Sequence, residues 1–211
     1  MFYRESAVEY LFTSRALMSQ AFNSLAAKIR SLSEARCENQ MYVWPGFDPM
    51  DPNPKKFFKK LGINFDGDLF ISYPVKMTFA PLSKEELTRQ EQILGAELPD
   101  DYIHLLQEFG PVHLPGAGKV IMESPLEALR STRAVWCEEG KPLSVLAVST
   151  YNRTSDGNSI GFVRKGNSFG PEIYEFDHEL VYSGEDPAHW TNKAGDSLAG
   201  FLLEYLNDLA K

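Results

Sequence analysis

The sequence predicts an α+β protein, and three observations support this fold class. Residues 82–110 read as two short helices with clear start and stop signals. Residues 145–182 contain segments in which apolar and polar side chains alternate, as they do in the strands of an antiparallel sheet. Residues 197–209 then repeat apolar residues at helical spacing. Helices before and after a run of strands are typical of an α+β domain.

The N-terminal part of the chain begins with a long predicted helix. Between Ser6 and about Ala35, apolar residues recur in alternating steps of three and four, at Val8, Leu11, Met18, Phe22, Leu25, Ile29 and Leu32. This stripe is either the buried face of a helix that packs on its own domain or the contact of a helical dimer. Prolines in residues 45–54 predict an irregular linker, residues 55–61 a short basic helix, and residues 68–79 a strand.

The two predicted helices in the middle of the chain have signals at both ends. Ser83 and Glu86 form a capping box, in which each side chain bonds a backbone N–H at the start of the helix. Gly95 ends this helix, because glycine readily adopts the left-handed conformation found there. Pro99 opens the second helix and Gly110 ends it.

Further elements follow in the second half of the chain. A capping box of Ser124 and Glu127 predicts a helix over residues 125–138. An Asp-Gly pair at residues 156–157 lies between two alternating segments, which is the strongest short signal of a β-hairpin. A strand is predicted over residues 171–182, followed by the C-terminal helix.

The order of these motifs resembles the SUKH superfamily, which contains fungal cell-wall assembly regulators and many bacterial immunity proteins. The residues that carry the resemblance are LS-x-EEL, LG, LP-x-x-Y and LL-x-x-FG in the helical pair, and it covers roughly residues 79–211. It implies two helices packed on a mostly antiparallel sheet, with a closing C-terminal helix. Residues 1–78 are then an N-terminal extension. The loop 111–118 departs from the family pattern, because Gly110 is followed by Pro111.

Charge is distributed unevenly between these two parts. Residues 1–78 hold 10 Lys and Arg against 8 Asp and Glu, whereas residues 79–211 hold 11 against 21. An acidic module attracts basic proteins and repels nucleic acid and anionic membranes. No apolar run approaches the roughly 18 residues of a membrane span, and the N-terminus carries no secretory signal. We therefore expect a cytoplasmic protein.

Motifs for catalysis, metal binding or cofactor binding are absent from the sequence. The four histidines are scattered, and there is no HExxH, GxSxG, Walker loop or dinucleotide fingerprint. We therefore expect no enzymatic activity, no cofactor and no metal site.

The candidate binding surface is one face of the last predicted strand. Glu175, Asp177 and Glu179 alternate with apolar residues, so their carboxylates share a face at a spacing of about 6.6 to 6.8 Å. We expect this face to point away from the core. The spacing is close to the pitch of phosphates along a nucleic-acid strand, which suits the cationic groove of a nuclease. A solvated face whose acids pair with Arg164 or Lys165 gives the same pattern.

Three classes of function are compatible with the sequence. The resemblance implies an immunity protein that neutralises a bacterial toxin, and the acidic charge independently favours a basic partner such as a nuclease or deaminase. The loop 111–118 and Trp136 are further candidate contacts. A regulatory scaffold that recruits several partners is the second class, and an enzyme, for which no catalytic residues can be named, is the third.

Overall fold

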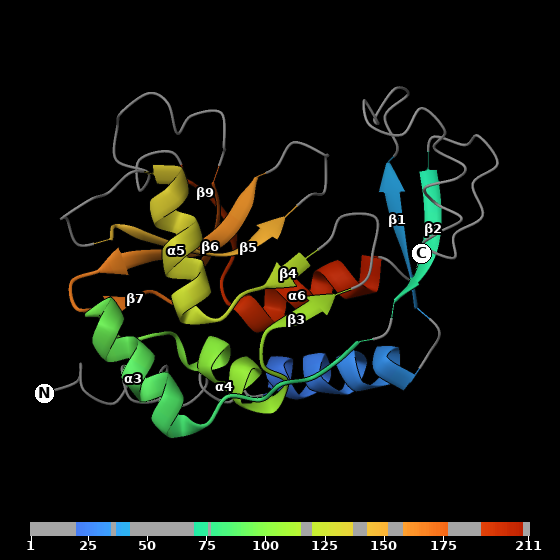
Figure 1. Ribbon diagram of the computed structural model, residues 1–211, viewed down its shortest axis with the longest axis horizontal. Helices are drawn as coiled ribbons and strands as arrows, with labels where there is room; N and C mark the ends of the chain where they lie inside the picture. Colours follow the sequence, from blue (N-terminus) through green and yellow to red (C-terminus); the bar gives the residue numbers. More distant parts are fainter. Residues whose placement is uncertain are drawn as a thin grey trace, which may run out of the picture.

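The structure, a computed structural model, describes residues 20–34, 37–42, 70–75, 77–114, 120–136, 143–151, 158–176 and 191–208. Within these ranges the chain forms five helices and a seven-stranded antiparallel sheet (Figure 1). The predicted α+β class is therefore confirmed. A second, separate sheet contains two strands.

The main sheet has the strand order β3-β4-β5-β6-β8-β9, with β7 paired to β6. Its strands are β3 (Val112–Leu114), β4 (Val120–Met122), β5 (Val145–Tyr151), β6 (Ser159–Lys165), β7 (Ser168–Phe169), β8 (Ile173–Phe176) and β9 (Thr191–Gly195). Neighbouring strands are close in sequence, which is the order that short antiparallel connections produce. The two-stranded sheet pairs β1 (Cys37–Tyr42) with β2 (Phe70–Val75).

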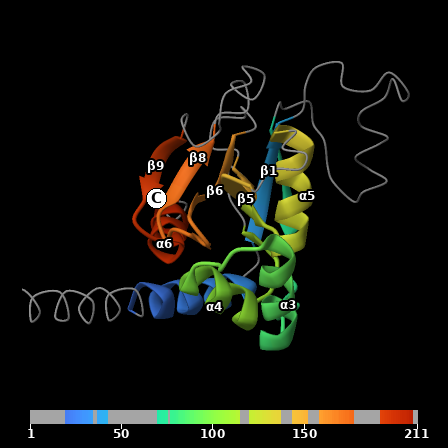
Figure 2. The ribbon, with the colours of Figure 1, turned by 90° about the vertical axis from the view of Figure 1, so that its left-hand side faces the viewer.

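The helices surround the main sheet. A helix over residues 20–34 lies together with α3 (Lys84–Leu94) and α4 (Asp100–Glu108) below the sheet in Figures 1 and 2. The other two are α5 (Pro125–Trp136), which packs beside β5, and α6 (Leu198–Asp208), which packs beside β9. Helix α3 also contacts α5, and α4 contacts α6. The predicted closing helix is therefore present.

The helix caps agree with the sequence signals. Ser83 Oγ accepts a hydrogen bond from the Glu86 N–H at 3.1 Å, and Gly95 closes α3 with a φ of 64°. The Glu86 carboxylate bonds side chains of its own helix, so this box is half formed. The second box is complete: Glu127 Oε2 accepts from the Ser124 N–H at 3.1 Å, and Ser124 Oγ accepts from the Glu127 N–H at 3.4 Å.

Gly110 allows the segment before α3 to lie directly against the end of α4. It has a φ of 74°, and a Cβ at this position would come within 1.9 Å of the Ala80 carbonyl oxygen. The Ala80 N–H donates to the Phe109 carbonyl oxygen at 3.0 Å, and the Leu82 N–H donates to that of Leu106 at 2.9 Å. A side chain at Gly110 would separate these two segments.

The 20–34 helix belongs to the main core. Leu25, Ala26 and Ile29 are buried in one apolar cluster with side chains of the other helices and of the main sheet. For this part of the apolar stripe, the structure agrees with a helix that packs on its own domain. The earlier stripe residues, Val8, Leu11 and Met18, lie outside the described residues. Dimerisation through them stays a prediction.

Contacts with α4 fix the position of this helix. The ring centroid of Phe22 lies 5.6 Å from that of His104. Arg30 forms an ion pair with Glu108, and its guanidinium lies 5.8 Å from the centroid of the Phe109 ring. The boundary between residues 78 and 79 stays a prediction. The 20–34 helix nevertheless shares its core with the part of the chain beyond that boundary.

Several predicted elements are shorter in the structure or fall outside the described residues. The predicted strand 68–79 is β2, which pairs with β1, a strand that was not predicted. The predicted strand 171–182 is described only as β8. Three predictions lie outside the described residues, namely the linker 45–54, the helix 55–61 and the turn 156–157.

Candidate functional site

One of the three carboxylates predicted to form a binding face lies in the described part of the chain. Glu175 is in β8, whereas Asp177 and Glu179 lie outside the described residues. Trp136 is the last residue of α5, and its side chain lies outside the description. The structure thus places Glu175 and Trp136 on separate elements. The face of three carboxylates stays a prediction.

Glu175 was expected to point away from the core, but it lies on the core side of the sheet. In the pairing of β6 with β8 it stands opposite Ile160, which is fully buried in the main core. Opposed residues share a face of the sheet. Glu175 therefore lies half-buried on the core side, where its Oε1 accepts a hydrogen bond from Asn158 Nδ2 at 2.9 Å. Tyr174 and Phe176 alternate with it, as predicted, and pack with a smaller cluster.

The basic residues of β6 bond other groups in the described structure. Arg164 Nη2 donates to the Gly95 carbonyl oxygen at 2.6 Å. Lys165 forms an ion pair with Glu172 at 2.9 Å. Neither Arg164 nor Lys165 therefore pairs with Glu175 in the described structure, although the sequence allowed such a pairing.

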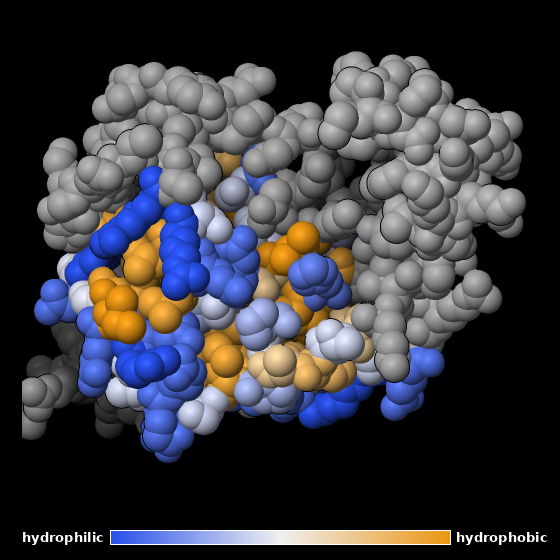
Figure 3. Space-filling view, in the orientation of Figure 1, coloured by the Kyte–Doolittle hydropathy of each residue, from blue (hydrophilic) through white to orange (hydrophobic). Residues whose placement is uncertain are grey.

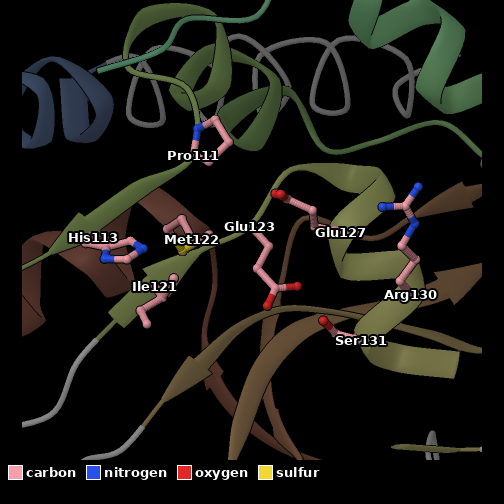
Figure 4. A pocket seen from close by; sticks show the side chains of 8 residues that line it. All are labelled: Pro111, His113, Ile121, Met122, Glu123, Glu127, Arg130 and Ser131. Atoms are coloured by element: carbon pink, nitrogen blue, oxygen red, sulfur yellow. The ribbon is translucent and has the colours of Figure 1, made fainter. Parts of the chain in front are cut away.

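A different surface brings carboxylates and polar groups together. An open hollow of about 410 Å³ lies where β3, β4 and α5 meet (Figure 4), and its lining includes His113, Ile121, Met122, Glu123, Glu127 and Ser131. We call it the Glu123 hollow. It includes the beginning of the loop 111–118, one of the candidate contacts. In Figure 3, hydrophobic residues are exposed over β3 and β4 with hydrophilic residues around them.

Hydrogen bonds from two other elements fix the backbone beneath the hollow. The Glu123 N–H donates to the Val148 carbonyl oxygen of β5 at 2.8 Å. The Tyr102 hydroxyl of α4 donates to the Glu123 carbonyl oxygen at 2.5 Å. The cap of α5 follows at once, and Glu127 and Ser131 lie one helical turn apart on the same face of that helix. These side chains line the hollow together with that of Glu123 (Figure 4).

The Glu123 side chain is half-buried and has no cation beside it in the described structure. Its Oε2 is buried and accepts no hydrogen bond from any described residue. Burial raises the pKa of this carboxyl, a hydrogen bond from Ser131 lowers it, and the negative charge of Glu127 raises it. No ion pair in the described part of the chain includes Glu123. One oxygen of a carboxylate that lines the hollow therefore has no partner among the described residues.

The other charged groups of the hollow do not neutralise this acceptor. Glu127 Oε2 accepts hydrogen bonds from the N–H and hydroxyl of Ser124, at 3.1 and 2.8 Å. Arg130 is exposed, and in Figure 4 its guanidinium is directed away from Glu123. Two carboxylates therefore outweigh one outward guanidinium, and the local field favours a cation.

The described residues of the hollow do not form a catalytic arrangement. Ser131 and His113 line it from different sides (Figure 4), and no described hydrogen bond joins them, as a serine nucleophile requires of its base. No cluster of three or more His, Cys, Asp or Glu suited to a metal ion occurs in the described ranges. None of the helices described is both long and apolar enough to cross a bilayer. Binding of a cationic group is the chemistry that this arrangement offers.

Glu123 and Ser131 were not predicted as site residues, and His113 was included only as part of the candidate loop 111–118. One signal was present, because Glu123, Glu127 and Ser131 are separated by four residues each, the spacing of neighbours on one helical face. The capping box already accounts for a glutamate at position 127, so the regular spacing of the three residues was not recognised as a separate signal. For His113 no local signal exists, since β3 comes to the site through its pairing with β4.

Comparisons with protein-family models, with curated proteins and with solved structures gave no match. The SUKH resemblance therefore stays a prediction from the sequence. Function is inferred from the hollow and from the charge of the chain.

Proposed function

We propose that this protein is a non-catalytic binding module that acts as an immunity protein and neutralises a bacterial toxin by direct contact. The observation that carries the proposal is the Glu123 hollow, an open site with an unneutralised carboxylate. It lies in a part of the chain, residues 79–211, that holds 21 acidic against 11 basic residues. The SUKH resemblance of the same part supports the immunity role. A toxin with a basic active-site groove, such as a nuclease or deaminase, fits this charge.

Neutralisation would follow from steric and electrostatic blockade. A nuclease groove holds phosphates with Lys and Arg side chains, so an acidic protein that covers it competes with nucleic acid for the same cations. The long-range attraction accelerates association, and salt screens it over a Debye length of about 8 Å at physiological ionic strength. The on-rate is therefore expected to fall steeply with salt, while the off-rate changes little.

The test uses the full chain and the toxin encoded by the neighbouring gene. Association and dissociation rates are measured by surface plasmon resonance at low and high salt, together with the activity of the toxin. We expect Glu123→Lys to weaken binding by at least about tenfold, or 1.4 kcal/mol. The control is Glu204→Lys, which makes the same change of charge at an exposed position of α6 and is expected to have little effect. Wild-type protein that neither binds nor inhibits the toxin would contradict the immunity role.

A triple variant separates the two candidate surfaces. Glu175, Asp177 and Glu179 are changed together to Lys, and binding is compared with that of Glu123→Lys. Thermal unfolding of the triple variant checks its fold, because Glu175 is half-buried on the core side. Loss of binding in the triple variant alone would assign the contact to the strand face and leave the immunity role in place. Loss in Glu123→Lys alone would assign it to the hollow.

A regulatory scaffold that recruits several partners is the second candidate function. The observation that favours it is the β1–β2 sheet, which is separate from the main sheet (Figure 1). A scaffold binds more than one protein at a time and leaves the activity of each intact. Full toxin activity in the presence of an excess of bound protein would favour this candidate.

A further inference from the structure

We propose that the Glu123 hollow is an arginine-binding site, which receives the guanidinium group of a side chain on the basic partner. This inference rests on the proposed function and names the contact through which binding occurs. Three features of the hollow support it: an acceptor without a donor, the sign of the surrounding charge, and the shape and composition of the walls.

The acceptor is the Glu123 carboxylate, which lines the hollow. A carboxylate has two oxygens with about four lone-pair sites. Oε2 is removed from water and has no partner among the described residues. Most buried polar atoms in folded proteins have a partner, so an orphaned oxygen requires an explanation. Oε2 has no surface open to water, so a guanidinium bonds it only once the carboxylate has rotated toward the hollow.

The surrounding charge selects a cation rather than an anion. Glu127, in the first turn of α5, adds a second negative charge, and its effect on the pKa of Glu123 has the sign expected of a like charge. Arg130 is directed outward, and His113 is an exposed residue on the β3 side. An anionic ligand would meet two like charges, whereas a guanidinium would relieve their repulsion.

The walls fit an arginine better than a lysine. The volume of about 410 Å³ is far more than the roughly 30 Å³ that one water molecule occupies in the liquid. Ile121 and Pro111 provide apolar surface for the methylene stem of a long side chain. A guanidinium presents its donors in a planar fork that can bond both oxygens of one carboxylate, which an ammonium cannot match in geometry.

A purely structural role does not explain the carboxylate. The bond that joins Glu123 to α4 uses its backbone carbonyl oxygen, and the bond to β5 uses its backbone N–H. A glutamine at this position retains both bonds and nearly the same shape. Glu123→Gln is therefore expected to fold, and it removes only the charge and one pair of acceptor sites.

The experiment titrates the full-length, ¹⁵N-labelled protein with N-acetyl-arginine N-methylamide and follows backbone amide shifts by NMR. N-acetyl-citrulline N-methylamide is the matched ligand, because it has nearly the same shape but no charge. We expect saturable shifts at the amides of Glu123 and Ser131, with an affinity at least about tenfold lower for citrulline and in Glu123→Gln. Glu172→Gln is the control variant, since that carboxylate pairs with Lys165 elsewhere on the sheet, and it is expected to bind like the wild type.

Equal shifts with the citrulline compound, unchanged binding in Glu123→Gln, or shifts confined to other parts of the protein would each overturn the inference. So would the absence of any saturable shift. The toxin assay is independent of this titration. Binding of the arginine compound without toxin binding would contradict the proposed function alone. Toxin binding that Glu123→Gln leaves unchanged would contradict the arginine site alone.

Discussion

Two carboxylates, Asp101 and Glu123, each have one buried oxygen without a hydrogen-bond partner among the described residues, but only Asp101 accepts a described backbone hydrogen bond at its other oxygen. Asp101 lies on α4, and its Oδ2 accepts a hydrogen bond at 3.0 Å from the Ala199 N–H at the start of α6, 98 residues away in sequence. Glu123 lies between β4 and α5, and its buried Oε2 accepts none from the described residues. Asp101 and the next residue of α4, Tyr102, reach these two regions: Asp101 bonds the start of α6, and the Tyr102 hydroxyl bonds the Glu123 carbonyl oxygen.

The difference distinguishes a structural carboxylate from one available to a ligand. Burial raises the pKa of both groups. At Asp101, the backbone N–H groups of Ala199 and Leu198 oppose that rise. These are among the first N–H groups of a helix, which have no partner within the helix itself. A raised pKa therefore does not by itself locate a binding site. The donors that surround the carboxylate, and the open volume beside it, decide between the two roles.

The largest effect is expected for Asp101→Ala. This change removes the acceptor at the N-terminus of α6 and leaves buried N–H groups without a partner, so the free energy of unfolding should fall by about 1 to 2 kcal/mol. Asp101→Asn retains an oxygen that can accept the Ala199 hydrogen bond and should recover most of the loss. Urea denaturation of both variants measures the difference. Equal losses in the two would mean that charge, rather than an acceptor, holds the start of α6.

The difference in stability between the wild type and Asp101→Asn should depend on pH, with a definite sign. Burial raises the pKa of Asp101 in the folded state above its ordinary value of 3.8. The folded state therefore binds a proton more tightly than the unfolded state. As the pH falls from neutral through the raised pKa, the wild type should gain stability relative to Asp101→Asn, and the gain is complete below the ordinary value. A gain in the opposite direction would show that the helix N-terminus outweighs burial.

A smaller loss of stability is expected for Tyr102→Phe, which tests the bond that connects α4 with the hollow. The tyrosine is fully buried, and its pKa is held well above 10.0, first by burial and then by the negative charges of Glu123 and Glu127. The hydroxyl therefore remains a donor across the working pH range. Its removal should cost about 0.5 to 1.5 kcal/mol, the net contribution of one hydrogen bond.

Hydrogen exchange at the Glu123 amide measures the local effect of this variant, and protection there should fall. Tyr174→Phe serves as the control, because Tyr174 is half-buried in a different cluster. Unchanged protection at the Glu123 amide in Tyr102→Phe would mean that β5 alone holds the junction.

Parts of the fold that depend on nearby residues could be predicted from the sequence, whereas the site could not. The caps of α3 and α5 involve residues within four positions of one another, so Ser83 and Ser124 show them directly. Strands β3 and β4 have three residues each and exist through pairing with each other and with β5. The bond of Asp101 to Ala199 and that of Tyr102 to Glu123 also join distant segments. The hollow is formed by such contacts, which a local pattern does not encode.

The smallest expected effect on stability is a gain, in Glu123→Gln at neutral pH. The pKa of Glu123 is raised above its ordinary value of 4.5, so the charged carboxylate destabilises the folded state at neutral pH. Glutamine removes this cost, and the gain should disappear below the ordinary value, where the carboxyl is protonated in both states. Because the side chain is half-exposed, solvent screening keeps the gain small. Thermal unfolding of wild type and variant at several pH values measures it.

The groups that face Glu123 decide how this pH series is read. Glu127 raises the cost of the charge, Ser131 reduces it through its hydrogen bond, and Arg130 points outward. His113 lines the hollow from the β3 side, so the series is repeated in the His113→Gln background. A destabilised Glu123→Gln in both backgrounds would mean that the carboxylate supports the fold as Asp101 does. A more stable variant that no longer binds the arginine compound is the combination expected of a residue retained for binding at the expense of stability.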